Sequence, residues 1–358
     1  MPRSLPLHRV PSPQAARAAG LRYTVSKDLD ILREGPPDAF RYRKDGKAVK
    51  DRNTLERIRA LAIPPAWTDV RICGAANGHL QATGYDVKGR KQYRYHPDWS
   101  AERSRSKFIH TLAFGEQLGS MRRKVEQHLT LPGLPAEKVL ATVVAVMDKT
   151  QIRMGNDAYA KENGSFGLST MKDRHVKKGA GGLRFVFKGK TGIAHDIRLG
   201  SSRLSRLVMR CRELPGQDLF QYLDEHGVPQ PIDSGMVNDY IRSITGGDFT
   251  SKDIRTWKGT VHCAKALLGQ AIVKTETARK QVINSALDQV AKQLGNTRTV
   301  CRKYYVHPEV LDAYGTDRLE NAAKAIRAAG GLSPEERMVI RLLRSAMRKR
   351  PAHLAKAA

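Results

Sequence analysis

Several cationic and phenolic side chains between residues 153 and 305 of this sequence are of types that act on phosphate esters. A guanidinium group is planar and permanently charged, and it can bind a phosphate through two hydrogen bonds. A lysine ammonium can deliver a proton, and a tyrosine hydroxyl can attack phosphorus once its proton has left. The residues of these types, together with one amide that can donate a hydrogen bond, are Arg153, Lys190, Lys252, Arg255, Asn296, Tyr304 and Tyr305.

The cations also have ordinary structural interpretations. Arg153 follows an apolar helical segment, where most arginines simply interact with the last carbonyls, and Lys190 stands at a predicted turn as any exposed lysine could. Lys252 and Arg255 differ, because residues three apart share one face near the positive start of a predicted helix. Two cations there are unfavourable unless an anion joins them, and we expect that anion to be a phosphate.

The tyrosine pair lies beside a predicted break in helical structure. Pro308 disfavours helix at His307, so Tyr304 and Tyr305 are close to a point where the backbone can turn a side chain outward. A tyrosine is more often a core or surface aromatic than a nucleophile. The spacing alone does not choose between the two tyrosines.

A second candidate site is the basic and aromatic segment from Lys88 to His96. In a strand, alternate residues share a face, so Tyr93 and Tyr95 lie together and Gln92 lies on the other face. The cations suit phosphates, and the amide and the rings suit base edges or stacking. The alternative is an amphipathic edge strand with solvated cations. The candidate DNA contacts are Lys88, Gln92, Tyr93 and Tyr95.

The elements that must position these residues are expected in two domains of an α+β protein. A small β-rich domain is predicted over residues 21–103, with strands at Leu21–Val25, Phe40–Arg43, Leu80–Thr83 and Lys91–His96 and a helix at Asp51–Leu61. A mostly helical domain is predicted over residues 104–330, with helices at Phe108–His128, Ala136–Lys149, Ser202–Cys211, Met236–Thr245, Thr260–Val273 and Ala278–Leu294.

Three further features complete the predicted organisation. The β-type runs Leu183–Phe187 and Ile193–Ile197, separated by glycines, predict a hairpin with Lys190 at its tip. Residues 1–20 are expected to be a flexible basic arm. Residues 331–358 are expected to be a basic helical tail that starts at Ser333 and Pro334.

The composition limits the classes of protein to consider. The 358 residues include 63 Lys and Arg against 35 Asp and Glu, and this net charge of +28 attracts polyanions, nucleic acid first. No run approaches the ~18 apolar residues of a membrane span, so we expect a cytoplasmic protein. Four cysteines far apart, without a C-x-x-C pair, predict neither a zinc site nor a dense disulfide framework. Without a P-loop or a divalent-metal motif, no cofactor is expected.

Taken in order, the candidate residues resemble the active-site series of type IB DNA topoisomerases, in the poxvirus-like branch found in bacteria. Upstream, Ile63-Pro-Pro-Ala-Trp67, Gln81-Ala-Thr-Gly84 and Lys88–Tyr95 resemble the DNA-clamping β domain of the same family. The two resemblances span roughly residues 60–315. They imply a monomer of two domains that closes around double-stranded DNA at the nucleoid.

The resemblance implies a role for each matching position. Tyr305 matches the nucleophile, which makes Tyr304 its neighbour. Arg153 and Arg255 match the two arginines that hold the scissile phosphate. Lys190 matches the general acid on the hairpin, and the residue three before the second arginine, Lys252, matches a helper position.

One position departs from the wider family pattern. Poxviral and eukaryotic members have His where this chain has Asn296, and an amide can donate a hydrogen bond but cannot shuttle a proton. The implied reaction is attack by Tyr305 on a phosphodiester, giving a 3′-phosphotyrosyl bond that keeps the energy needed for resealing. Neither ATP nor a metal ion is then required. While one strand is nicked, its free end can rotate about the intact strand and release supercoils.

Two alternative functions are considered. A tyrosine recombinase shares the Arg–Lys–Arg–Tyr chemistry, but it usually carries His-x-x-Arg where this chain has Lys252-x-x-Arg255. A DNA-binding protein without catalysis explains the charge of +28 but not the ordered series.

Overall fold

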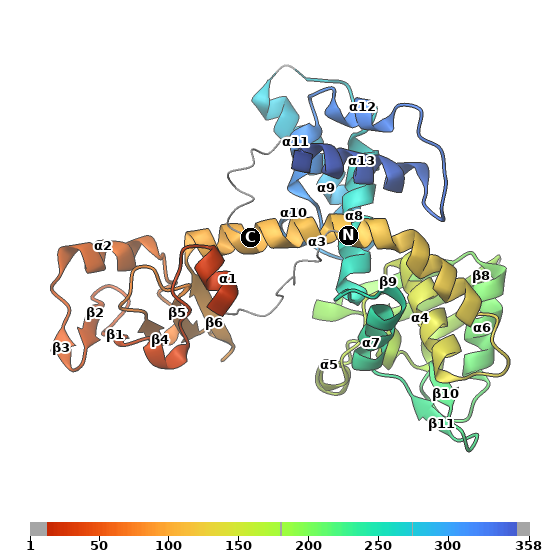
Figure 1. Ribbon diagram of the computed structural model, residues 1–358. Helices are drawn as coiled ribbons and strands as arrows, with labels where there is room; N and C mark the ends of the chain where they lie inside the picture. The colour runs from red at the N-terminus through yellow and green to blue at the C-terminus, as the bar shows by residue number, and fades with distance from the viewer. Residues whose placement is uncertain (1–12, 180, 274, 349–358) are drawn as a thin grey trace. The chain divides into compact units, whose positions relative to one another are not determined.

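The computed structural model describes residues 13–179, 181–273 and 275–348, and it divides into two compact units (Figure 1). The first unit extends to Ile109 and the second begins at His110. The long helix α3 (Pro97–His128) crosses this boundary. Each unit has a hydrophobic core of its own. The architecture is α+β, as the sequence predicts.

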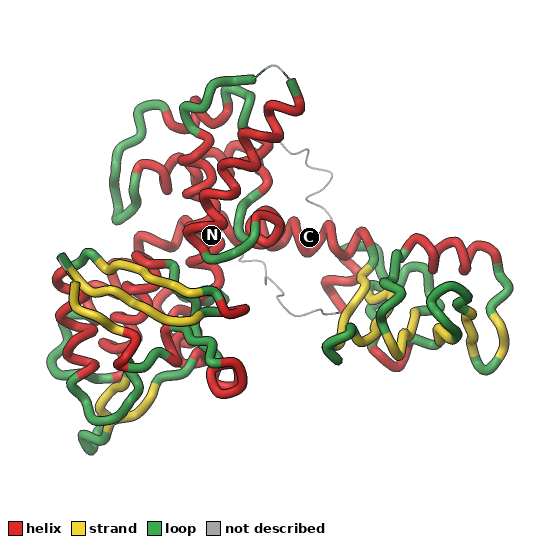
Figure 2. Tube along the Cα trace, turned by 180° about the vertical axis from the view of Figure 1, so that it is seen from behind, coloured by secondary structure: helices red, strands yellow, loops and turns green. Residues whose placement is uncertain are grey.

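The first unit is built on an antiparallel sheet whose strands appear in yellow in Figure 2. The strand order is β3-β2-β1-β4-β5-β6. The small core of this unit is formed by Ile31, Val70, Ile72 and Ala82 from the sheet with Ile58 from α2. The elements are β1 (Ile31–Glu34), β2 (Arg41–Lys44), β3 (Lys47–Ala48), α2 (Arg52–Ala60), β4 (Thr68–Ile72), β5 (Leu80–Tyr85) and β6 (Lys91–Tyr95).

The strand predicted at Leu21–Val25 is wrong. Only Arg22 forms an isolated bridge there, with Gly78. The backbone N–H of Thr24 donates instead to the imidazole Nδ1 of His79, at 3.0 Å, so a side chain takes the place of a neighbouring strand. The true first strand, β1, lies further along the chain.

The predicted basic arm differs in part from the structure. Its residues 1–12 lie outside the described residues, whereas Pro13–Ala18 form the short helix α1. Ala16 in this helix is fully buried in a cluster with Leu21 and Trp99. Apolar contacts of this alanine-rich helix therefore order part of the predicted arm.

The second unit is mostly helical and carries two small antiparallel sheets. A three-stranded sheet has the order β7-β8-β9, and β8 and β9 form the predicted hairpin. Its strands are β7 (Val176–Gly179), β8 (Gly182–Lys188) and β9 (Ala194–Leu199), and the second sheet pairs β10 (Gln221–Leu223) with β11 (Pro229–Pro231). The helices after α3 are α4 (Ala136–Thr150), α5 (Asp157–Asn163), α6 (Ser202–Arg212), α7 (Ser234–Thr245), α8 (Ser251–Leu267), α9 (Glu276–Leu294), α10 (Arg298–Tyr304), α11 (Pro308–Ala313), α12 (Arg318–Ala323) and α13 (Pro334–Arg348).

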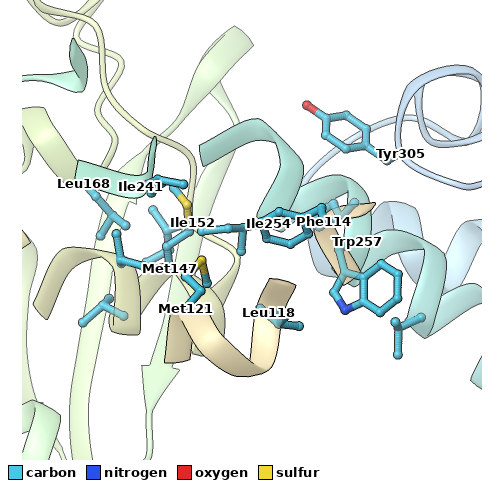
Figure 3. Packing of buried hydrophobic residues seen from close by; sticks show 14 of the residues in the cluster. Phe114, Leu118, Met121, Met147, Ile152, Leu168, Ile241, Ile254, Trp257 and Tyr305 are labelled. Carbon is cyan, nitrogen blue, oxygen red and sulfur yellow. The ribbon is translucent and has the colours of Figure 1, made fainter. Parts of the chain in front are cut away.

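Helix α8 is central to the second unit and packs against α4, α9 and α13 (Figure 1). It begins after Thr250, where Asp253 completes a capping box. The separate helix predicted at Thr260–Val273 is wrong, because its first half continues α8 and the helix ends at Leu267. Trp257 in α8 is fully buried beside α3 (Figure 3), where Gly115 leaves room for its ring.

The predicted C-terminal tail is helical but belongs to the core of the second unit. Helix α13 starts at a capping box, in which the N–H of Glu336 donates to Ser333 Oγ and the N–H of Ser333 donates to Glu336 Oε2. Its apolar face, including Val339 and Leu343, is buried in the main hydrophobic cluster. Residues 349–358 of the predicted tail lie outside the described residues. Within the described ranges, none of the helices combines the length and the apolar character that a membrane crossing demands.

Candidate active site

The backbone break after α10 gives the two neighbouring tyrosines opposite environments. Tyr305 is the C-cap residue that follows α10, and its N–H donates to the carbonyl of Cys301 at 2.9 Å. The Tyr304 side chain is 42% exposed, with the Lys303 ammonium 5.3 Å from its ring centre. Tyr305 is only 7% exposed and turns toward the second unit's core. Its hydroxyl points away from the apolar side chains labelled in Figure 3.

Helix α8 holds the backbone of Tyr305 by close approach. The Thr260 hydroxyl donates to the carbonyl of Tyr305 at 3.3 Å. Gly259 is the residue before Thr260, and a Cβ on Gly259 would lie 2.7 Å from the Tyr305 carbonyl oxygen. A glycine inside a helix costs ~1 kcal/mol relative to alanine, and here its missing side chain lets Tyr305 dock. The role of Gly259 was not predicted from the sequence. A glycine one turn after Arg255 in a helical segment is the signal that could have identified it.

Arg153 makes direct contact with the Tyr305 hydroxyl. Its Nη1 donates to that oxygen at 3.2 Å, and its Nη2 donates to Asn296 Oδ1. Helix α4 is capped by Gln151 in the left-handed conformation, and the chain has no regular secondary structure from there through Arg153. The N–H of Leu168 donates to the Arg153 carbonyl at 2.9 Å, which holds this segment in place.

Arg255 approaches the same tyrosine from α8. Its guanidinium carbon lies 5.4 Å from the centre of the Tyr305 ring. Its two Nη atoms donate to backbone carbonyls, that of Gln151 and, at 2.7 Å, that of Leu294. Burial lowers the pKa of Arg255 to about 10, and the neighbouring positive charge of Arg153 adds to this shift. The guanidinium remains charged at neutral pH.

The electrostatic balance at Tyr305 favours the phenolate. Burial by itself raises the pKa of the hydroxyl, but the charges of Arg153 and Arg255 and the hydrogen bond from Arg153 outweigh it. The net result is a pKa of Tyr305 below its usual value near 10.

Arg255 and Asn296 each have a buried donor that the described residues do not satisfy. The Nε of Arg255 and the Nδ2 of Asn296 are both buried without a hydrogen-bond partner in the described residues. In the same parts of the chain, no carboxylate forms an ion pair with Arg153 or Arg255. Buried polar groups are normally satisfied, so such orphans need an explanation. Two positive charges beside a phenol, with unsatisfied N–H groups on Arg255 and Asn296, are an arrangement that can bind an anion such as phosphate.

The structure brings together only some of the predicted catalytic residues. The active-site cluster, defined here as Arg153, Arg255, Asn296 and Tyr305, comes from the α4–α5 segment, α8 and the α9–α10 region. Lys190 is exposed in the Lys190–Gly192 turn between β8 and β9 and does not take part in these contacts. The residue at the start of α8, Lys252, is also exposed and outside the cluster.

The predicted DNA contacts of the first unit lie on and beside β6. Tyr93 is 48% exposed, and its ring stacks on that of Tyr95 with centroids 6.1 Å apart. This stacking confirms that the two tyrosines share a face. The amide of Gln92 donates to Asp86 Oδ2 at 2.9 Å, so it is already engaged within the protein. Lys88 is exposed in the turn between β5 and β6.

Comparison with known proteins gives consistent matches along the chain. Residues 90–329 match the family described as eukaryotic DNA topoisomerase I, catalytic core, and residues 39–86 match the bacterial DNA topoisomerase IB N-terminal domain. The chain is 31% identical over 292 residues to the DNA topoisomerase 1B of Acanthamoeba polyphaga mimivirus, covering 79% of this chain and 87% of the viral protein.

Poxvirus proteins give weaker matches of similar extent. The DNA topoisomerase 1 of rabbit fibroma virus (strain Kasza) is 24% identical over 294 residues, covering 76% of this chain and 88% of the relative. The DNA topoisomerase 1B of vaccinia virus (strain Copenhagen) is 23% identical over 291 residues, covering 75% and 88%.

Proposed function

The chain belongs to the type IB DNA topoisomerase family, and we propose that Tyr305 is the nucleophile with which it breaks and rejoins one strand of duplex DNA. The observation that carries this proposal is the convergence of two guanidinium groups, unpaired by carboxylates in the described residues, on one phenol. Neither a simple DNA-binding surface nor a structural tyrosine requires that arrangement.

The cluster accounts for the first half of the reaction. The Tyr305 oxygen attacks phosphorus and loses its proton, and a bond from phosphorus to the tyrosine oxygen forms as the bond to the 5′ oxygen of the next nucleotide breaks. Negative charge builds on the nonbridging oxygens during this step, and fixed donors aimed there lower the barrier. Arg153 and Arg255 supply the charge, and the unsatisfied N–H groups of Arg255 and Asn296 supply donors already in place.

The departing 5′ oxygen needs a proton, which we assign to Lys190. Its position at an exposed hairpin tip allows it to reach a bound DNA strand. Resealing runs the same steps in reverse, with the 5′ hydroxyl attacking the 3′-phosphotyrosine and returning its proton to the lysine. Because the phosphotyrosyl bond keeps the energy of the broken bond, the cycle consumes no ATP, and side-chain cations take the part that a metal ion plays elsewhere.

The remaining assignments follow the same proposal. The first unit, with Lys88, Gln92, Tyr93 and Tyr95 on and beside β6, is assigned to hold duplex DNA as the second half of a clamp. Lys252 is assigned to phosphate binding at the start of α8, outside the cluster. A monomer acting on the nucleoid in the cytoplasm is the expected working form.

A plasmid relaxation experiment tests the proposal. Supercoiled plasmid is incubated with the purified protein in chelator and without ATP, beside the variants Tyr305→Phe and Tyr304→Phe. Relaxation and a covalent protein–DNA adduct are expected for the wild type and for Tyr304→Phe, whose ring is exposed. Relaxation by Tyr305→Phe would remove this residue from its role. Exchange between two DNA sites would favour a recombinase, and retention without any topological change would favour a simple binding protein.

A further inference from the structure

His195 connects the hairpin to the hydrophobic core. It lies in β9 directly opposite Phe187 of β8, and the two rings stack with centroids 4.9 Å apart and planes 19° from parallel. Phe187 belongs to the main buried cluster. The imidazole therefore rests on the core side of the hairpin.

Two glycines leave the space that the imidazole occupies. A Cβ on Gly189 would lie 2.6 Å from both Cδ2 and Nε2 of His195, and a Cβ on Gly295 would lie 2.5 Å from its Cε1. Gly189 directly precedes Lys190, and Gly295 directly precedes Asn296. The ring of His195 therefore lies between two backbone segments. One is at Gly189, next to Lys190, and the other is at Gly295, next to Asn296 of the active-site cluster.

The segment around Asn296 has other anchors. The N–H of Asn296 donates to the carbonyl of Ala291 at 2.9 Å, and its side-chain oxygen accepts from Arg153. The carbonyl of Leu294 accepts from Arg255 at 2.7 Å. These bonds fix this side of the junction without His195.

The hairpin tip is held mainly by bonds within itself. The N–H of Gly189 donates to the carbonyl of Ile193 at 2.7 Å, and the N–H of Gly192 donates to the carbonyl of Gly189 at 3.1 Å. Just before the tip, the carbonyl of Lys188 accepts from the N–H of Phe166 at 2.8 Å. Contact with His195 is therefore a main link between the tip and the fixed segment around Asn296.

The charge state of His195 suits this position. Burial lowers the pKa of the imidazole, and the charges of Arg255 and Arg153 lower it further. The ring is neutral at neutral pH, so it stacks on Phe187 without placing a third positive charge beside the two arginines.

We propose that His195 is a positioning residue that sets the hairpin tip, and with it the Lys190 ammonium, relative to the departing 5′ oxygen. The inference rests on the proposed function, in which Lys190 is the general acid. Removal of the imidazole leaves a gap between Gly189 and Gly295, and the tip then samples positions from which the ammonium does not reach the leaving oxygen.

The test compares single-turnover cleavage of two DNA duplexes by wild type, His195→Ala, Lys190→Ala and the double variant. One duplex has the ordinary 5′ bridging oxygen at the cleavage site, and the other has sulfur, which departs as a thiolate without a proton. With the oxygen duplex, we expect His195→Ala to cleave roughly 10- to 100-fold more slowly, a part of the ~10²–10⁴-fold that general acid catalysis contributes. With the sulfur duplex, cleavage should be within a few-fold of wild type. The double variant should be no slower than Lys190→Ala.

Controls separate positioning from folding. His226 lies in an exposed turn, and its side chain is 80% accessible. The variant His226→Ala should therefore cleave both duplexes at the wild-type rate. His195→Phe retains an aromatic ring, and rescue of the oxygen-duplex rate relative to His195→Ala supports the positioning role of the ring. A lowered Tm of His195→Ala would not obscure the result, because partial unfolding slows cleavage of both duplexes by the same factor. The ratio of the cleavage rate of the sulfur duplex to that of the oxygen duplex therefore still reports on proton delivery.

Three outcomes overturn the proposal in different ways. An equal defect of His195→Ala on both duplexes removes the link to proton delivery. A double variant much slower than Lys190→Ala shows that His195 acts independently of the lysine. If Lys190→Ala itself shows no rescue by sulfur, the general-acid role fails and the inference fails with it, whereas absence of cleavage by the wild type overturns the proposed function first.

Discussion

Two groups of buried charge on helix α8 are treated in opposite ways by the fold. The first is the active-site cluster, to which α8 contributes Arg255. The second lies one turn further along the helix at Lys258, and we call it the balanced cluster: Arg122, Asp148, Lys258 and Glu336. It has two cations and two carboxylates, whereas the active-site cluster has two cations and no carboxylate.

The balanced cluster satisfies its charges within the protein. Arg122 donates to both oxygens of Asp148 at 3.0 Å and to both oxygens of Glu336 at 2.8 Å. Lys258 pairs with the same two acids at 3.0 and 3.4 Å. Burial raises the pKa of each carboxyl, but the two cations outweigh it, so both remain ionised. These contacts join α3, α4, α8 and α13.

The comparison separates two uses of a buried cation. Burying a charge is costly unless it is paired, and the balanced cluster meets that condition with its own acids. The active-site cluster leaves Arg255 Nε and Asn296 Nδ2 without partners in the described residues. We interpret that imbalance as binding capacity reserved for a phosphate. Stability should therefore depend on the balanced cluster, and the rate of chemistry on the active-site cluster.

The largest effect is expected from Arg122→Ala. Among the described residues, this change leaves Asp148 and Glu336 buried with Lys258 as their one remaining cation, and breaking a buried pair typically costs ~3–5 kcal/mol. We expect a loss of that size in the free energy of unfolding, measured by urea denaturation followed by circular dichroism. A loss below ~1 kcal/mol in the free energy of unfolding would show that the balanced cluster does not stabilise the fold as a buried ion network.

The balanced cluster also predicts how stability depends on pH. The folded-state pKa values of Asp148 and Glu336 lie below their ordinary values of 3.8 and 4.5. The stability that these carboxylates contribute is fully present at a pH above their ordinary, unfolded-state pKa values. It is lost as the pH falls through their lower, folded-state pKa values. In Arg122→Ala the folded-state pKa values of the two carboxyls should rise, because Arg122 helps to lower them, so the acid-side loss of stability should be smaller and should end at a higher pH than in wild type.

The second-largest effect is expected from Arg153→Ala, and it should appear in rate. Loss of one preorganised donor to a transition-state oxyanion typically costs ~10²–10³-fold. Single-turnover cleavage should slow by about that factor, while the Tm stays the same or rises, because an unpaired cation has been removed beside Arg255. A large fall in Tm with little change in the rate would reverse the roles of the two clusters.

The same variant sharpens the electrostatic part of the comparison. Since the arginine pair holds the pKa of Tyr305 below 10, wild-type cleavage should rise with pH and level off below pH 10. Without Arg153, this plateau should move to higher pH. An unchanged profile would show that ionisation of the tyrosine does not limit the cleavage step.

Gly259→Ala tests packing at the active site without changing charge, and its expected effect is smaller. The new Cβ would press on the Tyr305 carbonyl, and overpacking in a well-packed region costs ~1–3 kcal/mol. We expect slower cleavage from a displaced Tyr305 and a modest fall in Tm. Gly200→Ala is the matched control, because its Cβ would have no atom within 4 Å. Normal cleavage by Gly259→Ala would contradict the need for this close approach.

The smallest effect is expected from Lys265→Ala. Lys265 pairs with Glu335 at 2.8 Å and, like the balanced cluster, links α8 to α13, but its side chain is 65% exposed. Exposed ion pairs contribute ~0–1 kcal/mol, so unfolding should change by no more than that. A loss comparable to that of Arg122→Ala would mean that contact between these helices, and not burial, decides the energetics.

Much of the fold followed from local sequence signals. The capping boxes at Thr250 and Ser333, the glycine after α9 and the glycine-flanked hairpin all act through residues a few positions away. Such signals fix where elements start and stop. The prediction of a strand at Leu21–Val25 was wrong because the backbone of Thr24 bonds to the side chain of His79, which lies 55 residues further along the chain. A local pattern does not contain that contact.

The candidate site was only partly readable. Residue type and spacing alone favoured a structural interpretation of Arg153 and left Tyr304 and Tyr305 open. The family resemblance is what assigned Arg153, Arg255 and Asn296 to the site and chose Tyr305. The structure adds that one ring is exposed while the other meets Arg153. Gly259 and His195 were missed because their importance lies in what they touch, and a single glycine or histidine carries no such information in its type.

The sequence by itself determined the supply of groups: a large positive charge, the order of cations and phenols, and the helices and hairpin that carry them. Tertiary structure alone decided how those charges are paired. Arg122 reaches Glu336 across 214 positions, and Arg153 reaches Tyr305 across 152. Because electrostatic energy depends on distance in space and on burial, an arginine is paired with two carboxylates in the balanced cluster, whereas the arginines of the active-site cluster have no carboxylate partner among the described residues.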